Sequence, residues 1–289
     1  MVIYDFSNIV VGAVMDYFNK TGQQPDLPLM RHIALNTIIH DKEKKARYLG
    51  ELGVVLAFDG VNYWRRDVFP NYKQNRKKGQ EKSKFDFGQF YTDFDILKQE
   101  FKENVPYRCI EVRRAEADDI IATLCKKFGQ HEKICIVGAD KDFLQIQEWD
   151  LQYPVVQYSP WHQKFLTLEM KEHTLIEHIC GGDSGDGIPN IWSDVDTFVT
   201  DGIRQKPFSK KMRESVKQSG FSGISSVLRD AQELERFKQN RTLIDLTQIP
   251  EYIQNAILSE YDNSVVAQGR FHKYCVEHKL RKIMEQGKI

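Results

Sequence analysis

The sequence has no long hydrophobic run and no apparent secretory signal. In 289 residues the longest uninterrupted apolar runs are Val54–Phe58 and Ile134–Val137. These runs have the length of strands, whereas a transmembrane helix needs roughly 20 apolar residues. Asp5 follows Met1 too closely to leave room for a secretory signal. We therefore expect a cytoplasmic protein that does not associate with membranes.

Cysteine and histidine are present without the spacings of a metal or disulfide framework. There is no C-x-x-C pair among the five cysteines and no H-x-x-x-H or H-E-x-x-H pattern among the eight histidines. Each cysteine has apolar neighbours, which indicates reduced core residues. Any bound metal is then expected to be a hard ion held by oxygen. The cysteines are Cys109, Cys125, Cys135, Cys180 and Cys275.

The chain also has no net charge, with 41 basic and 41 acidic residues. The net charge is zero because basic and acidic segments of the chain cancel. Residues 64–84 carry a net charge of +6, residues 204–217 carry +5 and residues 270–288 carry +4, while the acidic residues are concentrated elsewhere. Segregation of this kind leaves basic surfaces for a nucleic-acid partner despite the neutral total.

The order of strand and helix patterns predicts the fold class. Strands are expected at 2–4, 53–58, 107–112, 133–139, 155–158 and 164–168, and helices at 7–19, 29–50, 87–103 and from 116. After about residue 170 only helical patterns remain. This order predicts an α/β domain over residues 1–170, with a mostly parallel twisted sheet flanked by helices, followed by an α-helical domain over residues 171–289.

Aspartates follow three of the expected buried strands. Asp5, Asp59 and Asp140 each come just after such a strand, and the carboxyl ends of parallel strands meet at one edge of the sheet. Further carboxylates begin the following helices or lie in the glycine-rich segment 181–187. The nine candidate metal ligands are Asp5, Asp59, Glu116, Asp118, Asp119, Asp140, Asp142, Asp183 and Asp186.

So many carboxylates at one edge require neutralisation. Two carboxylates ~4 Å apart repel by roughly 4 kcal/mol at an effective dielectric constant of 20. Several such pairs would exceed a total stability of about 5–15 kcal/mol unless protons or cations neutralise them. Oxygen ligands favour Mg²⁺ or Mn²⁺, and two such ions ~4 Å apart are suited to phosphodiester hydrolysis. Two simpler alternatives are a structural Ca²⁺ site and, for residues 116–119, acidic residues that complement a helix dipole.

The basic segment between these acidic elements opens with Tyr72-Lys73-Gln74-Asn75-Arg76. It is either a solvated surface loop or a phosphate contact. Its position between two site-bearing elements favours the phosphate contact. Tyr63, Trp64 and Phe69 nearby either stack on unpaired bases, at about 1–3 kcal/mol per base, or pack this segment on the domain.

Six motifs in a fixed order resemble one family. IYDFSN, AFDG, YKQNR, EADD, ADKD and GGDSGDGIPN resemble the flap endonuclease / 5′→3′ exonuclease family, and VVQYSPWHQKF and FKQNRTLIDLTQIPEYI are similar to its phage ribonuclease H branch. The resemblance covers nearly the whole chain. It implies a PIN-like 5′ nuclease fold and a Mg²⁺-dependent structure-specific 5′ nuclease with exonuclease and flap endonuclease activity. It further implies RNase H-like primer removal in DNA replication and products with a 5′ phosphate.

The same resemblance implies roles for the candidate residues. The first of two Mg²⁺ ions, for which Mn²⁺ can substitute, is assigned to Asp5, Asp59, Glu116 and Asp118. The second ion is assigned to Asp140, Asp142, Asp183 and Asp186, with Asp119 beside both. Lys73 and Arg76 match the family's basic pair at the scissile phosphate. The catalytic residues implied are Lys73, Arg76, Asp118 and Asp142.

The resemblance also implies two nucleic-acid-binding elements. These are a basic helical arch at about 64–90 and a helix–three-turn–helix-like element from Gly181. Residues 191–196 replace the family's glycine-rich hairpin, which puts a bound monovalent cation there in doubt. The expected nucleic-acid contacts are Tyr72, Lys73, Arg76, Lys77, Lys78, Lys206, Lys210, Lys211 and Arg213.

The expected partners are DNA and RNA–DNA duplexes with 5′ ends or flaps, bound by a monomer. A replication clamp or single-strand-binding protein is a further candidate partner. Ile283–Ile289 is either a candidate docking segment for it or a chain end that simply frays. Two other functions are compatible with parts of the pattern. A metal-dependent phosphatase shares the strand-end aspartates, and a non-catalytic DNA-junction-binding protein shares the basic segments.

Overall fold

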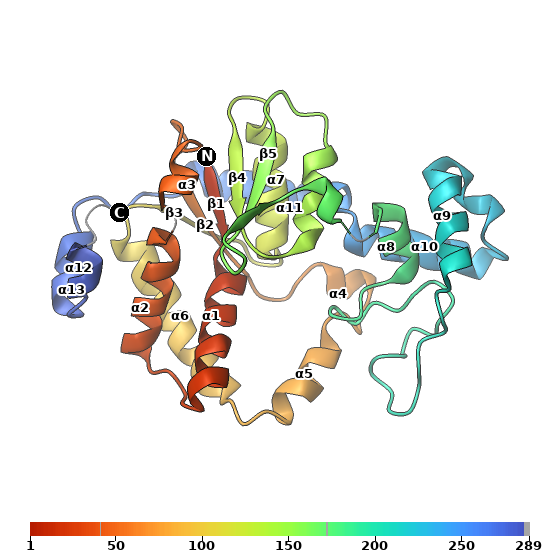
Figure 1. Ribbon diagram of the computed structural model, residues 1–289, viewed down its shortest axis with the longest axis horizontal. Helices are drawn as coiled ribbons and strands as arrows, with labels where there is room; N and C mark the ends of the chain where they lie inside the picture. The colour runs from red at the N-terminus through yellow and green to blue at the C-terminus, as the bar shows by residue number, and fades with distance from the viewer. Residues whose placement is uncertain (41, 172, 286–289) are drawn as a thin grey trace. The chain divides into compact units, whose positions relative to one another are not determined.

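The computed structural model (Figure 1) describes residues 1–40, 42–171 and 173–285, and the chain divides into two compact units. The α/β unit comprises Met1–Val61, Phe85–Leu168 and the chain from Glu251 onward. The helical unit comprises Asn62–Lys84 and Glu169–Pro250. The last four residues of the candidate docking segment at the C-terminus lie outside the described residues.

A six-stranded sheet forms the centre of the α/β unit, in the order β3-β2-β1-β4-β5-β6. All neighbouring strands are parallel except the antiparallel pair β5 and β6. The expectation of a mostly parallel sheet flanked by helices is therefore confirmed. The strands are β1 (Val2–Asp5), β2 (Val54–Phe58), β3 (Arg108–Glu111), β4 (Ile134–Val137), β5 (Val155–Ser159) and β6 (Lys164–Leu166).

Helices cover both faces of this sheet. On one face α1 (Phe6–Thr21), α2 (Leu27–Ile39) and α6 (Phe87–Asn104) share a core with alternate strand residues, and the Phe6 ring meets the Phe58 ring edge-on at 5.1 Å. α7 (Ala117–Phe128) packs on β1, β2 and β4, with α11 (Glu251–Asn263) beside it. Burial from both sides explains why the strands are continuous apolar runs.

The helix expected at 29–50 is two helices in the structure. α2 ends at Ile39 and α3 spans Lys42–Ala46, because His40 adopts a non-helical backbone with ψ of 137°. Side chains bind the carbonyls at this end of α2. The Tyr4 hydroxyl donates to the Ile38 carbonyl at 2.9 Å, and the Lys45 ammonium donates to the His40 carbonyl at 2.5 Å. These bonds replace the ones that a continuing helix would make.

The C-terminal helices are helical as expected, but they belong to the α/β unit. The Phe128 ring lies 4.8 Å from the Tyr261 ring of α11, and the Arg108 guanidinium donates to the Tyr261 and Ser264 carbonyls at 3.2 and 2.9 Å. α12 (Phe271–Glu277) and α13 (Arg281–Glu285) join the core of the same unit. The predicted domain 171–289 differs from this division because periodicity identifies helices but not the surface on which they pack.

The helical unit has a separate core. The helices of this unit are α4 (Arg65–Val68), α5 (Gln74–Glu81), α8 (Leu175–Gly181), α9 (Lys210–Gly223) and α10 (Ala231–Ile244). The segment 64–90, predicted as a helical arch, supplies α4 and α5 to this unit. Where a helix–three-turn–helix-like element is expected, α8 and α9 are joined by residues 182–209.

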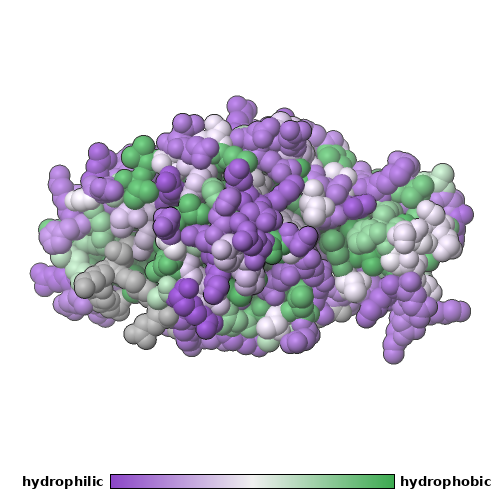
Figure 2. Space-filling view, turned by 90° about the horizontal axis from the view of Figure 1, so that it is seen from above, coloured by the Kyte–Doolittle hydropathy of each residue, from purple (hydrophilic) through white to green (hydrophobic). Residues whose placement is uncertain are grey.

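The surface is predominantly hydrophilic on the face that Figure 2 shows, with hydrophobic residues in separate patches. Within the described ranges, no helix combines the length and the apolar character that crossing a membrane requires. All five cysteines are buried and unpaired with one another, as expected for reduced core residues. Burial raises the pKa of the Cys109 thiol to about 12, so this thiol stays protonated at neutral pH.

Candidate active site

Seven of the nine predicted metal ligands lie at the carboxyl edge of the sheet. β1 ends at Asp5, β2 ends one residue before Asp59, and β4 ends shortly before Asp140. The pairing of Asp5 with Ala57 and of Tyr4 with Val137 aligns these three strand ends. The helical turns that follow add the other four. The seven are Asp5, Asp59, Glu116, Asp118, Asp119, Asp140 and Asp142.

Asp5 lies at the centre of this edge, where it is 2% exposed. Its carboxylate caps α1 by accepting from the Asn8 amide at 3.4 Å. The main chain after β4 passes directly against it, since a β-carbon added to Gly138 would lie 3.2 Å from the β-carbon of Asp5. Glycine at this position therefore lets the β4 turn approach Asp5 closely.

Asp59 is fastened to the start of α7. Its carboxylate accepts from the Ala117 amide at 2.9 Å, and its own amide donates to the Ser7 hydroxyl at 3.0 Å. The next residue, Gly60, donates to the Ala115 carbonyl at 3.0 Å. These bonds join the β2 turn to both α1 and the turn that precedes α7.

The start of α7 combines capping with site residues. Asp119 accepts from the Glu116 amide at 2.9 Å, while the Glu116 side chain accepts from the Asp119 amide. These two residues are 0% and 1% exposed, respectively. Glu116 and Asp119 therefore cap this helix reciprocally, and their predicted role at a metal stays a prediction. Asp118 is half-buried and takes no part in these two capping bonds.

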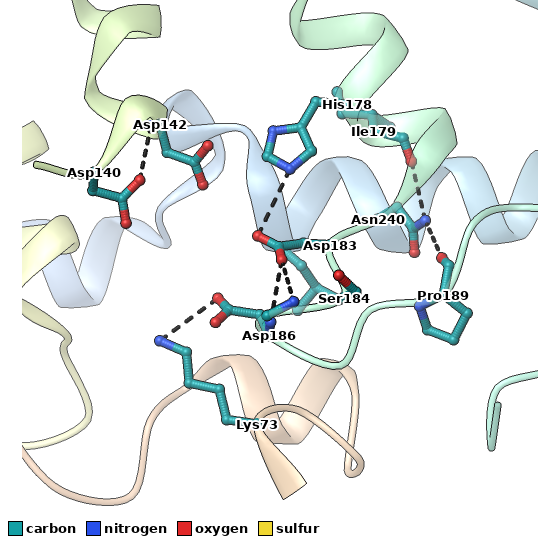
Figure 3. Close-up of polar contacts among 12 residues, drawn as sticks. Lys73, Asp140, Asp142, His178, Ile179, Asp183, Ser184, Asp186, Pro189 and Asn240 are labelled. Atoms are coloured by element: carbon teal, nitrogen blue, oxygen red, sulfur yellow. Dashed lines mark hydrogen bonds and ion pairs between the residues drawn. The ribbon is translucent and has the colours of Figure 1, made fainter. Parts of the chain in front are cut away.

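The turn after β4 is also fixed by hydrogen bonds. Asp140 accepts from the Asp142 amide at 2.9 Å (Figure 3) and so begins a 3₁₀ helix at Lys141–Glu148. The buried Gln157 amide group donates to the Gly138 and Asp140 carbonyls at 3.1 and 2.5 Å. Both carboxylates are half-buried, so they remain accessible for coordination.

The chemistry of this donor set fits hard divalent cations. It consists of carboxylate oxygens, and three of the carboxylates, Asp5, Glu116 and Asp119, are at most 2% exposed. Crowding and burial of like charges are costly, and divalent cations offset that cost. Carboxylates are the ligands that Mg²⁺ and Mn²⁺ prefer. The residues present therefore fit the metals that the sequence predicts.

Asp183 and Asp186 belong to the helical unit, in a glycine-rich turn that we call the acidic loop (residues 182–187). The Asp183 carboxylate accepts from the Gly185 and Asp186 amides at 2.7 and 3.2 Å, and lies 3.7 Å from the His178 ring nitrogen. Burial alone would raise the pKa of Asp183, but the contacts with His178 and the amides lower it below its usual value. His178 was not predicted, because no metal-ligand spacing marks it in the sequence.

The Asp186 carboxylate contacts three predicted nucleic-acid-binding residues. The Tyr72 hydroxyl donates to it at 2.9 Å, and the Lys73 ammonium and Arg76 guanidinium lie 3.6 and 2.5 Å away (Figure 3 shows Lys73). Lys73 and Arg76 thus meet at one carboxylate, and their contact with the scissile phosphate stays a prediction. Tyr72 is 2% exposed: its ring packs in the core of the helical unit and its hydroxyl reaches the Asp186 carboxylate, so its contact with nucleic acid stays a prediction.

The remaining predicted contacts lie on the surface of the helical unit. Lys77, Lys206, Lys210 and Lys211 are exposed. Lys78 pairs with Asp201 at 2.7 Å, and the Arg213 guanidinium lies over the Phe208 ring at 4.4 Å.

Two of the three candidate stacking residues are buried instead. Trp64 and Phe69 are 2% and 3% exposed. The packing alternative is therefore correct for both of them.

Comparison with known proteins identifies the family. A family model described as "5'-3' exonuclease, N-terminal resolvase-like domain" matches residues 31–178, and one described as "T4 RNase H, C terminal" matches residues 170–287. Ribonuclease H of Enterobacteria phage T4 is 31% identical over 97% of this chain and 92% of its own length. The chain belongs to the 5′–3′ exonuclease family. The expected enzyme class, a 5′ nuclease, is thereby confirmed.

Two further proteins are similar to this chain. Flap endonuclease Xni of Shewanella woodyi is 28% identical over 76% of this chain and 84% of its own length. A solved structure of T5 5′-exonuclease with bound divalent metal ions (zinc) has a TM-score of 0.62 and 16% identity, over 93% of this chain and 99% of that one. This structural likeness confirms the fold.

Proposed function

We propose that this nuclease hydrolyses phosphodiesters with two Mg²⁺ ions, at 5′ ends and flaps of DNA and RNA–DNA duplexes. The observation that carries the proposal is the convergence of seven carboxylates on one edge of the sheet. In an open parallel sheet this edge is where ligands bind.

The carboxylates fall into two groups by the elements that hold them. Asp5, Asp59, Glu116 and Asp118 would hold one cation. Asp140 and Asp142 would hold the second, with Asp183 and Asp186 as further predicted ligands from the acidic loop and Asp119 supporting Glu116. Two divalent cations supply Lewis-acid activation of water and neutralise charge on the leaving oxygen. Hydrogen bonds among the turns keep these ligands in place before cations bind.

Lys73 and Arg76 would bind the scissile phosphate and offset its developing charge. Both are fixed cations beside the acidic loop, and charge-assisted hydrogen bonds to phosphate are stronger than neutral ones. Lys73 carries the larger role because its side chain is only 13% exposed, whereas that of Arg76 is 52% exposed. Electrostatic interactions are stronger where water is excluded.

The exposed lysines would grip the duplex backbone without reading its sequence. Lys206, Lys210 and Lys211 lie at or near the start of α9, and Lys77 lies on α5. Phosphate contacts of this type position a duplex but carry no base specificity. Structure-specific recognition is consistent with that chemistry, and RNA-primer removal during DNA replication is the role we propose for it. The ribonuclease H of phage T4 and the flap endonucleases among the relatives support this choice.

A cleavage assay tests the proposal. A 5′-labelled flap duplex is incubated with the full chain and Mg²⁺, Ca²⁺ or a chelator. We expect cleavage near the junction with Mg²⁺, and none with chelator. A junction-binding protein would bind without cutting in all three conditions, and a small-molecule phosphatase would release phosphate from p-nitrophenyl phosphate but leave the flap intact. Either outcome would contradict the proposed activity.

A further inference from the structure

Three donors from one segment converge on the Asp186 carboxylate. The Tyr72 hydroxyl donates to Oδ2 at 2.9 Å, and the Lys73 Nζ lies 3.6 Å from the same oxygen. The Arg76 Nη2 donates to Oδ1 at 2.5 Å. A hydroxyl and two cations around one anion are the recognition elements of a phosphate site. Here a carboxylate of the same chain occupies that position.

The main chain holds these groups in place. The Lys73 amide donates to the Asp186 carbonyl at 2.8 Å, and the Arg76 Nε donates to the Gly185 carbonyl at 3.2 Å. The Asn75 amide group donates to the Ser184 carbonyl at 2.7 Å. The start of α5 is thus bonded along the acidic loop, so the ion pairs are not chance contacts of long side chains.

The backbone at Lys73 supports a functional interpretation. Lys73 has a φ of 59° and a ψ of 15°, the left-handed conformation that lysine rarely adopts. Such a conformation costs about 1–3 kcal/mol and persists where surrounding contacts enforce it. The bond from its amide to Asp186 is one such contact. The backbone therefore directs Lys73 to the acidic loop.

We propose that, in the metal-free chain, the Asp186 carboxylate occupies the phosphate-binding subsite formed by Tyr72, Lys73 and Arg76, and that a substrate phosphate displaces it. The inference rests on the proposed function, in which Lys73 and Arg76 bind the scissile phosphate. A carboxylate and a phosphodiester each offer anionic oxygens to the same donors. Since those donors already contact Asp186, phosphate binding must break existing ion pairs, and Asp186 lowers the affinity for nucleic acid.

Asp183 offers a matched control within the same loop. It carries the same charge, but its Oδ1 accepts from the Gly185 and Asp186 amides and its Oδ2 faces His178. Replacing either aspartate with asparagine removes one negative charge from the acidic loop. Only the change at Asp186 removes the carboxylate that contacts Lys73 and Arg76.

The test is binding of a fluorescent flap duplex in chelator, measured by anisotropy at several salt concentrations. We expect Asp186→Asn to tighten metal-free binding roughly tenfold, which corresponds to one charge-assisted hydrogen bond made available to the duplex. The slope of log affinity against log salt should steepen by about one for each additional phosphate that the protein neutralises. Asp183→Asn should tighten binding less than about threefold and leave the slope nearly unchanged.

Equal effects of the two substitutions, or no effect of either, would overturn the proposal. A thermal unfolding curve identifies a variant that fails to fold, and Asp186→Ser then replaces Asp186→Asn with the same expectation. In an Arg76→Ala background the effect of Asp186→Asn should shrink, and an undiminished effect would also overturn the proposal. Because the assay needs no metal and no cleavage, its result is independent of whether the wild-type chain cuts flaps with Mg²⁺.

Discussion

At the scale of single residues, backbone hydrogen bonds place the side chains of the candidate site. Asp59, Asp119 and Asp140 each accept from a main-chain amide at 2.9 Å. Each bond leaves further oxygen lone pairs on the carboxylate, because a carboxylate has about four. These aspartates therefore fix turns and helix starts and still have oxygen lone pairs for the proposed metal ions.

Lys73→Ala should lower the single-turnover cleavage rate by about 10²–10³ at saturating enzyme, with a smaller loss of affinity. The reason is that, in the proposed function, the Lys73 ammonium offsets charge that develops in the transition state. Lys73→Gly should lose the same amount of rate, because glycine adopts the positive φ at this position without strain. Lys84→Ala, at an exposed lysine of the same basic segment that is not among the predicted contacts, is the control and should keep the wild-type rate. An unchanged rate with only weaker binding would make Lys73 a phosphate anchor.

At the scale of elements, the site depends on how closely turns approach each other. A β-carbon on Gly60 would lie 2.1 Å from the Val112 carbonyl oxygen and 2.9 Å from that of Ala115. The turn after β2 and the turn before α7 can therefore meet only because residue 60 is glycine. This close contact places the Asp59 carboxylate beside the first turn of α7, where it accepts from the Ala117 amide.

Gly60→Ala should destabilise the chain by about 2–4 kcal/mol and lower cleavage more than about tenfold, since the turn before α7 must move. Urea unfolding and the flap assay measure the two effects. Gly79→Ala in α5 is the control, because nothing lies within 4 Å of its added β-carbon. Alanine there should stabilise the helix by up to about 1 kcal/mol. A Gly60→Ala protein that unfolds and cuts like the wild type would contradict the argument.

A second element-scale contact joins three helices of the α/β unit. Glu100 on α6 accepts from the Arg31 guanidinium at 2.6 and 2.8 Å and from the Tyr274 hydroxyl at 2.8 Å. Burial alone would raise the pKa of Glu100, but the bonds from Arg31 and Tyr274 lower it below its ordinary value. A lowered carboxyl pKa contributes stability above the unfolded pKa of about 4.3, and this contribution is lost as the pH falls through the folded pKa.

Glu100→Gln should therefore lower the free energy of unfolding by about 1–3 kcal/mol at pH 7, and by much less near pH 3. Urea unfolding at the two pH values measures this. Glu103→Gln, on the exposed side of the same helix, should have little effect at either pH. An equal loss of unfolding free energy at pH 7 and pH 3 would show that the charge of Glu100 does not cause the destabilisation.

Much of the α/β unit could be predicted from sequence, because buried parallel strands are continuous apolar runs and their ends mark the site. The break between α2 and α3 could not, since it depends on Tyr4 and Lys45 binding carbonyls from other elements. The burial of Tyr72 was missed for the same reason, because it depends on packing against residues distant in sequence. The contact of His178 with Asp183 joins residues close in sequence, and it was missed because it depends on the conformation of the turn after α8.

At the scale of the whole molecule, the predicted cation ligands and the predicted phosphate contacts are largely divided between the two units, although the total charge is neutral. The carboxylate edge belongs to the α/β unit, and all nine predicted nucleic-acid contacts belong to the helical unit. Each unit has its own hydrophobic core. In our proposal, the basic residues of the helical unit bind phosphate groups, while the acidic edge of the sheet binds the cations that support hydrolysis.

The most direct test of this account compares Asp118→Asn with Asp262→Asn in flap cleavage and flap binding. Asp118 is half-buried at the carboxylate edge, whereas Asp262 is exposed on α11, and both substitutions remove one negative charge. We expect Asp118→Asn to abolish Mg²⁺-dependent cleavage while flap binding persists, and Asp262→Asn to cut like the wild type. Equal turnover of Asp118→Asn and the wild type would contradict the assignment of the active site to this edge of the sheet.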